Sequence, residues 1–236
     1  MHFKVFAAVL IAAQCSVAAF ALPLVPGGVV NPTGTTFAAD PEQGGLVIQD
    51  NLLAFSTTDP AVPLATVASG NVQDRVVRST LTGNLIFAHR IRDVQSLFGT
   101  VGGVIRRLEY GGYANNGSFT SDVDFRLDGV GDEGSPAAVR SVDGNVIGWA
   151  LSLDVGSLVG SVREESRFLT IKSNAKHFSN TGYIDIWATR GNGTGLFKTR
   201  LTGIAVPDVA PVPLPASVLM LGMALAGLVR FKRKSA

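Results

Sequence analysis

Cysteine is nearly absent from this chain of 236 residues, and its one cysteine, Cys15, lies in an apolar stretch near the N-terminus. Without disulfides, the rest of the chain must be stabilised by packing alone. Histidine is also scarce: His89 and His177 stand alone after the first residues, in no zinc-binding pattern. No Gly-x-Ser-x-Gly elbow of a serine hydrolase occurs either. We therefore predict a protein without catalytic residues, metal site or cofactor, which is not an enzyme.

Most of the chain has no large excess of basic over acidic residues. The sequence has 20 basic and 18 acidic residues, but five of the cations lie near the two ends. They are Lys4, Arg230, Lys232, Arg233 and Lys234. Without these five, 15 basic and 18 acidic residues remain, a net charge of −3. Nucleic-acid binding needs clustered cations in surplus, so the composition argues against that class of partner.

The N-terminus has the pattern of a secretory signal peptide. Lys4 precedes an uncharged apolar stretch over residues 5–20, and Ala19 and Ala21 form a small-x-small cleavage site. We expect residues 1–21 to be removed and Leu22 to open the mature chain. An uncleaved membrane helix is the alternative, but the apolar stretch is short for one.

The C-terminus combines prolines, a short apolar run and a basic tail. Pro213 and Pro215 keep the approach extended, so a helix can begin only near Ala216 and end before Arg230. About fourteen helical residues span roughly 21 Å, against a hydrocarbon core of about 30 Å. We expect a short transmembrane helix whose cations stay on the cytoplasmic side, which places the preceding chain outside. An ordinary anchor that is never processed is the alternative.

The order of these C-terminal parts resembles the VPLPA variant of the bacterial PEP-CTERM sorting domain. The motif residues are Val212, Pro213, Leu214, Pro215 and Ala216, and the basic tail is Arg230, Lys232, Arg233 and Lys234. The resemblance implies transient recognition by an exosortase, a membrane protease that removes the tail. It also implies an inner-membrane intermediate and delivery to the cell surface or the extracellular polysaccharide matrix of a Gram-negative bacterium.

The middle of the chain has short apolar runs separated by turns, a pattern typical of an all-β protein. We expect a Pro/Gly-rich extended region with one or two short strands over residues 22–75, and a β-sandwich domain over 76–206. Residues 207–236 then hold a linker and the sorting signal. Glycine turns at 82–84, 143–144 and 192–193 separate apolar runs, and about nine to eleven strands indicate an antiparallel β-sandwich or jelly roll. A short helix is expected near 93–98.

One strand is expected at residues 122–128, where strict alternation places Val123, Phe125 and Leu127 on one face and the charges on the other. The expected core residues are large and apolar throughout. They are Phe125, Trp149, Phe168, Ile184, Ile186, Trp187 and Phe197.

Three groups of residues are of types that could bind a ligand or catalyse a reaction. The acidic segment 122–133 contains calcium-ligand types, but it lacks the EF-hand spacing. Four carboxylates could converge for glycoside hydrolysis: Asp154, Glu164, Glu165 and Asp185. Four aromatic residues could stack on sugars, although core packing is their commoner use: Tyr110, Tyr113, Tyr183 and Trp187. We expect a structural or adhesive role, associated with extracellular polysaccharide. The alternative is a lectin-like carbohydrate-binding module, in a calcium-dependent or a calcium-independent form.

Overall fold

The computed structural model describes residues 21–62, 65–97, 101–114, 119–157 and 163–209. They form two packed six-stranded sheets and one short 3-10 helix, η1, at Pro41–Gln43. Sheet A holds, in order, β1 (Leu22–Pro23), β7 (Asp122–Phe125), β10 (Leu169–Lys172), β5 (Leu85–Gln95), β4 (Thr66–Ser79) and β3 (Gly45–Thr58). Sheet B holds β12 (Phe197–Asp208), β11 (His177–Arg190), β6 (Gly103–Gly111), β9 (Val146–Asp154), β8 (Ala138–Arg140) and β2 (Val29–Val30).

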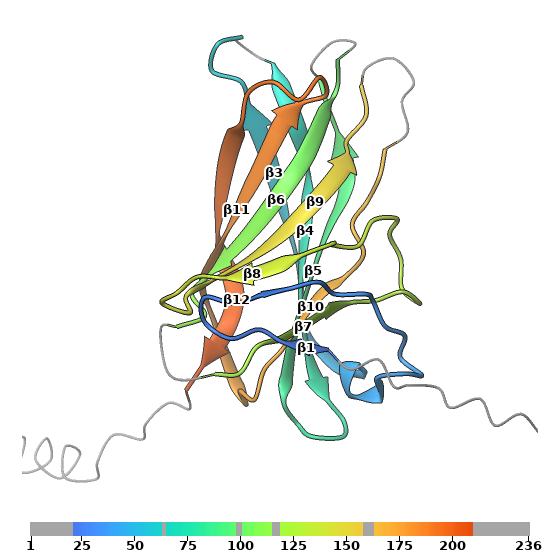
Figure 1. The fold of residues 1–236 in the computed structure, drawn as a ribbon, viewed down its shortest axis with the longest axis vertical. Coiled ribbons are helices and arrows are strands. Elements are labelled where there is room, and N and C mark those ends of the chain that lie inside the picture. Colours follow the sequence, from blue (N-terminus) through green and yellow to red (C-terminus); the bar gives the residue numbers. More distant parts are fainter. Residues whose placement is uncertain (1–20, 63–64, 98–100, 115–118, 158–162, 210–236) are drawn as a thin grey trace, which may run out of the picture.

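Neighbouring strands run antiparallel in both sheets. In Figure 1, β11, β6 and β9 of sheet B pass in front of β3, β4 and β5 of sheet A. The predicted antiparallel β-sandwich is thereby confirmed. Within the described ranges, no helix has the length and apolar character needed to cross a membrane.

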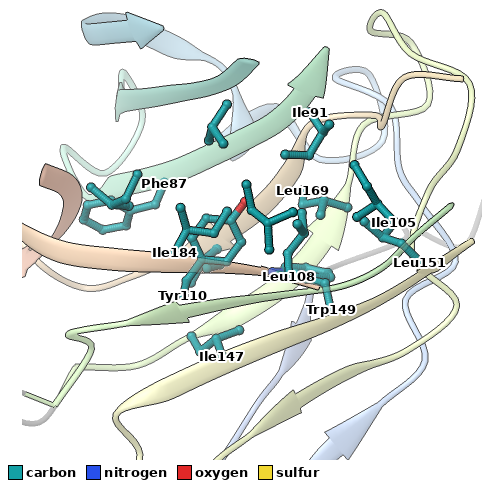
Figure 2. Packing of buried hydrophobic residues seen from close by; sticks show 14 of the residues in the cluster. Phe87, Ile91, Ile105, Leu108, Tyr110, Ile147, Trp149, Leu151, Leu169 and Ile184 are labelled. Atoms are coloured by element: carbon teal, nitrogen blue, oxygen red, sulfur yellow. The ribbon is translucent and has the colours of Figure 1, made fainter. Parts of the chain in front are cut away.

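The hydrophobic core fills the space between the sheets, as the alternation of strand side chains dictates. Figure 2 shows Leu169 of sheet A close to Leu108 and Trp149 of sheet B, with Ile91 of sheet A above them and Phe87 of sheet A beside Tyr110 and Ile184. All seven are fully buried. A core of this kind supplies most of the stability of a domain without disulfides, at about 25 cal/mol per Å² of apolar surface removed from water.

Most of the predicted core residues are buried, and two are not. Phe125, Trp149, Ile184 and Ile186 belong to the core, as predicted. Phe168 is buried too, but it lies beneath the guanidinium of Arg75, 4.5 Å from its ring centroid. The other two expected core residues, Trp187 and Phe197, are only half-buried. Phe197 packs against the core, whereas Trp187 alternates with inward-facing neighbours and stands on the outer face of sheet B.

Several predicted elements differ from the structure. Residues 45–75 are not an extended arm, because β3 is a strand of 14 residues that pairs along most of its length with β4. No helix forms at 93–95, because β5 continues through Gln95 opposite Ser69. The hairpin turns are confirmed: Gly83 and Gly144 adopt positive φ angles of 69° and 74°, which favour glycine.

The strand predicted over 122–128 ends early. β7 stops at Phe125, and Leu127 is 44% exposed instead of facing the core. Asp124 was expected on a polar face but is buried, because the loop at Gly34 covers it and donates its N–H to Asp124 Oδ1 over 3.0 Å. A segment distant in sequence therefore covers this face of sheet A, which local alternation does not reveal.

The predicted terminal signals fall largely outside the described residues. Ala19 and residues 210–236, with the VPLPA-type motif, the apolar run and the basic tail, lie beyond them. Of the predicted cleavage site, the structure describes Ala21, which is buried, and Leu22, which begins β1 opposite Val123.

Candidate functional site

The outer face of sheet B carries the most distinctive cluster of aromatic and charged side chains that the structure describes. Ile184, Ile186 and Ala188 of β11 point into the core, so the alternate residues of this strand point outward. These are Tyr183, Asp185 and Trp187. We call these three residues and their outward-facing cross-strand neighbours the outer B face; the neighbours are Arg107, Glu109, Gly111, Gly148, Lys198 and Arg200.

Strand register arranges this face in rows that run across the strands. Asp185 lies between Glu109 of β6 and Arg200 of β12. In the next row, Trp187 lies between a cation of β6 and one of β12, Arg107 and Lys198. Directly opposite residues of an antiparallel pair have Cβ atoms about 4.5–5.5 Å apart, so each row is a set of interacting neighbours.

Asp185 is held by a two-pronged ion pair. Arg200 donates from Nε and Nη2 to the two carboxylate oxygens, each over 2.6 Å, and Lys198 Nζ lies 3.5 Å away. Burial of the Asp185 side chain favours the neutral acid, but the hydrogen bonds and charges of these two cations outweigh it and lower its pKa. The pKa of Arg200 is raised in return, chiefly by its hydrogen bonds to Asp185. Its guanidinium also lies over the ring of Tyr183, 3.8 Å from the centroid.

Trp187 is fixed by one hydrogen bond and two cation–π contacts. Its indole Nε1 donates to Glu109 Oε2 over 2.8 Å. The guanidinium of Arg107 lies 4.9 Å from the ring centroid and the ammonium of Lys198 lies 5.2 Å from it. Such contacts contribute about 0.5–1 kcal/mol each at exposed sites. The indole is therefore oriented, while the cations beside it remain on the surface.

A shallow pocket of about 330 Å³ opens beside this row. Its lining residues are Glu109, Val139, Arg140, Ser141, Val146, Gly148, Tyr183 and Asp185. Glycine keeps the surface open: a Cβ on Gly148 would lie 2.9 Å from Val139 Cγ2, and one on Gly111 would lie 2.1 Å from Tyr183 Cζ. Small-ligand sites range from about 300 to 1,000 Å³, so this pocket is at the small end of the range.

The chemistry of this pocket fits hydrogen bonding better than proton transfer. Asp185 and Glu109 are cross-strand neighbours, and a carboxylate pair is what glycoside hydrolysis requires. One member must then act as a general acid, with a raised pKa. Asp185 has a lowered pKa and both oxygens bonded to Arg200, so it is a poor proton donor. Carboxylates held charged in this way are suited to accept hydrogen bonds from hydroxyl groups.

The four carboxylates considered for glycoside hydrolysis do not lie together in one site. Glu164 Oε2 accepts the backbone N–H of Asp154 over 2.8 Å, which joins these two. Glu165 instead pairs with Arg90 of sheet A, and Asp185 lies on the outer B face. The sequence analysis missed Glu109, although its place on the polar side of an alternating strand was a usable signal.

The two pairs of predicted aromatic residues are divided between the core and the surface. Tyr110 and Tyr113 are fully buried, and burial raises the pKa of both phenols. Tyr183 and Trp187 are half-exposed on the outer B face. His89, one of the two histidines that the structure describes, is fully buried in the core.

The acidic side chains after β7 accept hydrogen bonds from residues around them. Asp128 accepts the N–H of Phe37 and the Nε of Arg126, both over 2.7 Å. Asp132 accepts the N–H of Glu165 over 3.0 Å. In the part of the chain that the structure describes, no three His, Cys, Asp or Glu residues gather into a group that could hold a metal ion.

No family model, no curated protein and no solved structure matches this chain.

Proposed function

We propose that the protein is exported and acts, without catalysis, in a structural or adhesive role at the cell surface or in the extracellular polysaccharide matrix. One observation carries this proposal: the motif at 212–216, a short apolar run and a basic tail follow one another at the C-terminus. The signal-peptide pattern over residues 1–21 gives independent support, since both ends direct the middle of the chain out of the cytoplasm.

The proposed route begins at the inner membrane. The short C-terminal helix holds the exported chain there until an exosortase-type protease removes the tail. The mature protein then associates with polysaccharide and requires neither a cofactor nor a nucleic acid.

Substitutions in the motif test this route. Replacing Pro213 and Pro215 together with alanine should leave an untrimmed protein in the inner membrane. Ser217→Ala, a matched change just outside the motif, should be trimmed as the wild type is. Cell fractionation with intact-mass analysis separates these results, and trimming of the double variant at the wild-type level would contradict the proposed motif.

A second candidate function is carbohydrate binding through the outer B face. The observation that favours it is the row of Arg200, Asp185 and Glu109 beside the indole of Trp187, with an open pocket next to it. Planar charged groups bind pairs of hydroxyls, and aromatic rings stack on the apolar faces of sugars.

A glycan array with the full chain tests this second candidate, with Trp187→Ala as the variant. Loss of a glycan signal in that variant would support carbohydrate binding by the outer B face. An array on which the wild-type protein binds no glycan would argue against it. A melting temperature that rises with millimolar calcium would indicate the calcium-dependent form, because a ligand stabilises the state that binds it.

A further inference from the structure

A larger pocket lies at the end of the sandwich, where β1 of sheet A approaches β8 of sheet B. Its volume is about 600 Å³, and we call it the end pocket. Its described lining residues are Pro23, Leu24, Val25, Pro26, Ala114, Phe119, Thr120, Ser121, Asp122, Arg140, Asp143 and Gly144. The lining is thus apolar on one side and polar on the other, and it includes a buried arginine.

Arg140 is a buried cation without a carboxylate partner. It follows the exposed Val139 in β8, so its side chain points inward, and the residue is only 8% exposed. Its Nε donates to the carbonyl of Gly144 over 2.9 Å, and its Nη1 donates to the carbonyl of Leu24 over 3.2 Å. Among the described residues, no carboxylate pairs with this guanidinium and no acceptor bonds its Nη2. Burial lowers the pKa of Arg140, as expected for a charge removed from water.

A second polar group of the pocket is also unpaired. Ser121 is 3% exposed, and its Oγ has no hydrogen-bond partner among the residues that the structure describes. The backbone of Leu24 connects the two groups: its N–H donates to the carbonyl of Ser121 over 2.8 Å, and its carbonyl accepts from Arg140. The backbone of Leu24 is therefore bonded to both residues at the pocket.

The rim of the end pocket has a different chemistry. Asp143 is exposed, and its carboxylate accepts the hydroxyl of Ser141 and the N–H of Asn145. Asp122 is half-buried, and burial raises its pKa. A bare anion would meet these two acids as well as Arg140. A ligand that combines one anionic group with several hydroxyls suits the whole pocket better.

We propose that the end pocket binds a hexuronate, the carboxylate-bearing sugar unit of acidic polysaccharides. Its carboxylate would bind the free side of the Arg140 guanidinium, since a planar fork matches a carboxylate. Its ring hydroxyls would donate to the acids at the rim, and its C–H face would lie on the apolar lining at Phe119. This inference rests on the proposed matrix association, for which it names a ligand.

Titration calorimetry of the full chain in detergent micelles tests the proposal. The probes are glucuronate and galacturonate, with glucose and galactose as neutral matches and acetate as the bare carboxylate. We expect both neutral sugars and acetate to bind at least tenfold more weakly than the better of the two uronates. A neutral sugar or acetate that binds as tightly, or uronates that do not bind, would overturn the proposal.

Two variants connect the binding to these side chains. Arg140→Lys keeps the charge but loses the fork, and Phe119→Ala removes the apolar surface on which the sugar ring would lie. Each should weaken uronate binding by about tenfold, whereas Arg107→Gln on the outer B face should not change it. Phe119→Ala keeps the test valid if Arg140→Lys fails to fold, because Phe119 is only half-buried. Unchanged uronate affinity in the folded variants would contradict the site.

The two proposals can fail separately. If uronates do not bind but trimmed protein is recovered from the matrix, only the end-pocket proposal falls. If uronates bind but the protein is cytosolic, the proposed function falls and the pocket remains.

Discussion

The imidazole of His89 lies flat on the phenol ring of Tyr110, with ring centroids 4.1 Å apart and planes inclined by 17°. The first belongs to sheet A and the second to sheet B, so this stack connects the two sheets inside the core. Beside it, Asp74 Oδ1 lies 3.1 Å from His89 Nδ1, and both side chains are fully buried. Asp74 Oδ2 accepts the backbone N–H of Ala205 in sheet B over 3.1 Å. A polar cluster therefore joins the sheets within an apolar core.

Removing the acid from this cluster should be costly. Asp74→Ala leaves the Ala205 N–H and the side-chain amide of Gln49 without their acceptor, and a buried donor left unpaired costs about 1–3 kcal/mol. Urea unfolding measures this difference. The matched control is Asp50→Ala, which removes the partner of Arg75 in a partly exposed ion pair and should cost about 1 kcal/mol or less. Equal losses in the two variants would show that the cluster does not stabilise the fold.

This cluster also shows where prediction from sequence ends. The glycine turn at residues 82–84 between two apolar runs predicted the hairpin that contains His89, because this signal is local. Tyr110 borders a Gly-Gly turn and was considered for sugar binding, yet it is buried against His89. The contact depends on how two sheets pack, and residues 21 positions apart in different sheets leave no periodic signal.

The outer B face was predictable to the same limited extent. Tyr183 and Trp187 could be placed on one strand, and side chains four residues apart in a strand lie on the same face. Their interaction with Glu109, and the open floor at Gly148, depend on the strand order β11-β6-β9. Strand order arises from long-range pairing and is not encoded in any single segment. The covering of Asp124 by the Gly34 loop has the same origin.

Neutralising Asp124 should stabilise the protein at neutral pH. Burial raises the pKa of this carboxyl. The hydrogen bonds from the N–H groups of Phe125 and Gly34 lower the pKa, but the charge of Asp40 raises it further. A carboxyl whose pKa is raised in the folded state makes its full contribution to the stability of the fold below about pH 3.9. This contribution is lost as the pH rises through the pKa of the folded state. Asp124→Asn keeps an acceptor oxygen without the charge. We expect its melting temperature to exceed the wild type by about 2–4 °C at pH 7, and to equal it near pH 3.

Neutralising Asp185 should lower the stability at neutral pH, the opposite of the effect expected for Asp124. The pKa of Asp185 is lowered despite burial, mainly by the hydrogen bonds of Arg200, so its contribution is present above about pH 3.9 and is lost as the pH falls through the folded pKa. Asp185→Asn should therefore melt about 2–4 °C below the wild type at pH 7, a loss of about 1 kcal/mol. The deficit should shrink in acid. Calorimetric melting of the two variants across pH checks both signs, and shifts in the same direction would refute the assignment.

Gly111 should tolerate no side chain, because a Cβ there would lie 2.1 Å from Cζ of the Tyr183 ring. Gly111→Ala must displace that ring from beneath Arg200, at a cost of about 1–3 kcal/mol. Gly129→Ala is the control, since its nearest atom is Arg126 Cβ at an ordinary 3.5 Å. Urea unfolding should show a loss for the first and a change within about 0.5 kcal/mol for the second. Equal stability would mean that Tyr183 does not rest on Gly111.

Export followed by trimming at both ends is the central claim, and the intact mass of the protein extracted from cells tests it most directly. The account predicts that surface-extracted protein begins at Leu22 and lacks the basic tail from Arg230 to Lys234. Cytosolic protein that retains both Met1 and Ala236 would contradict it.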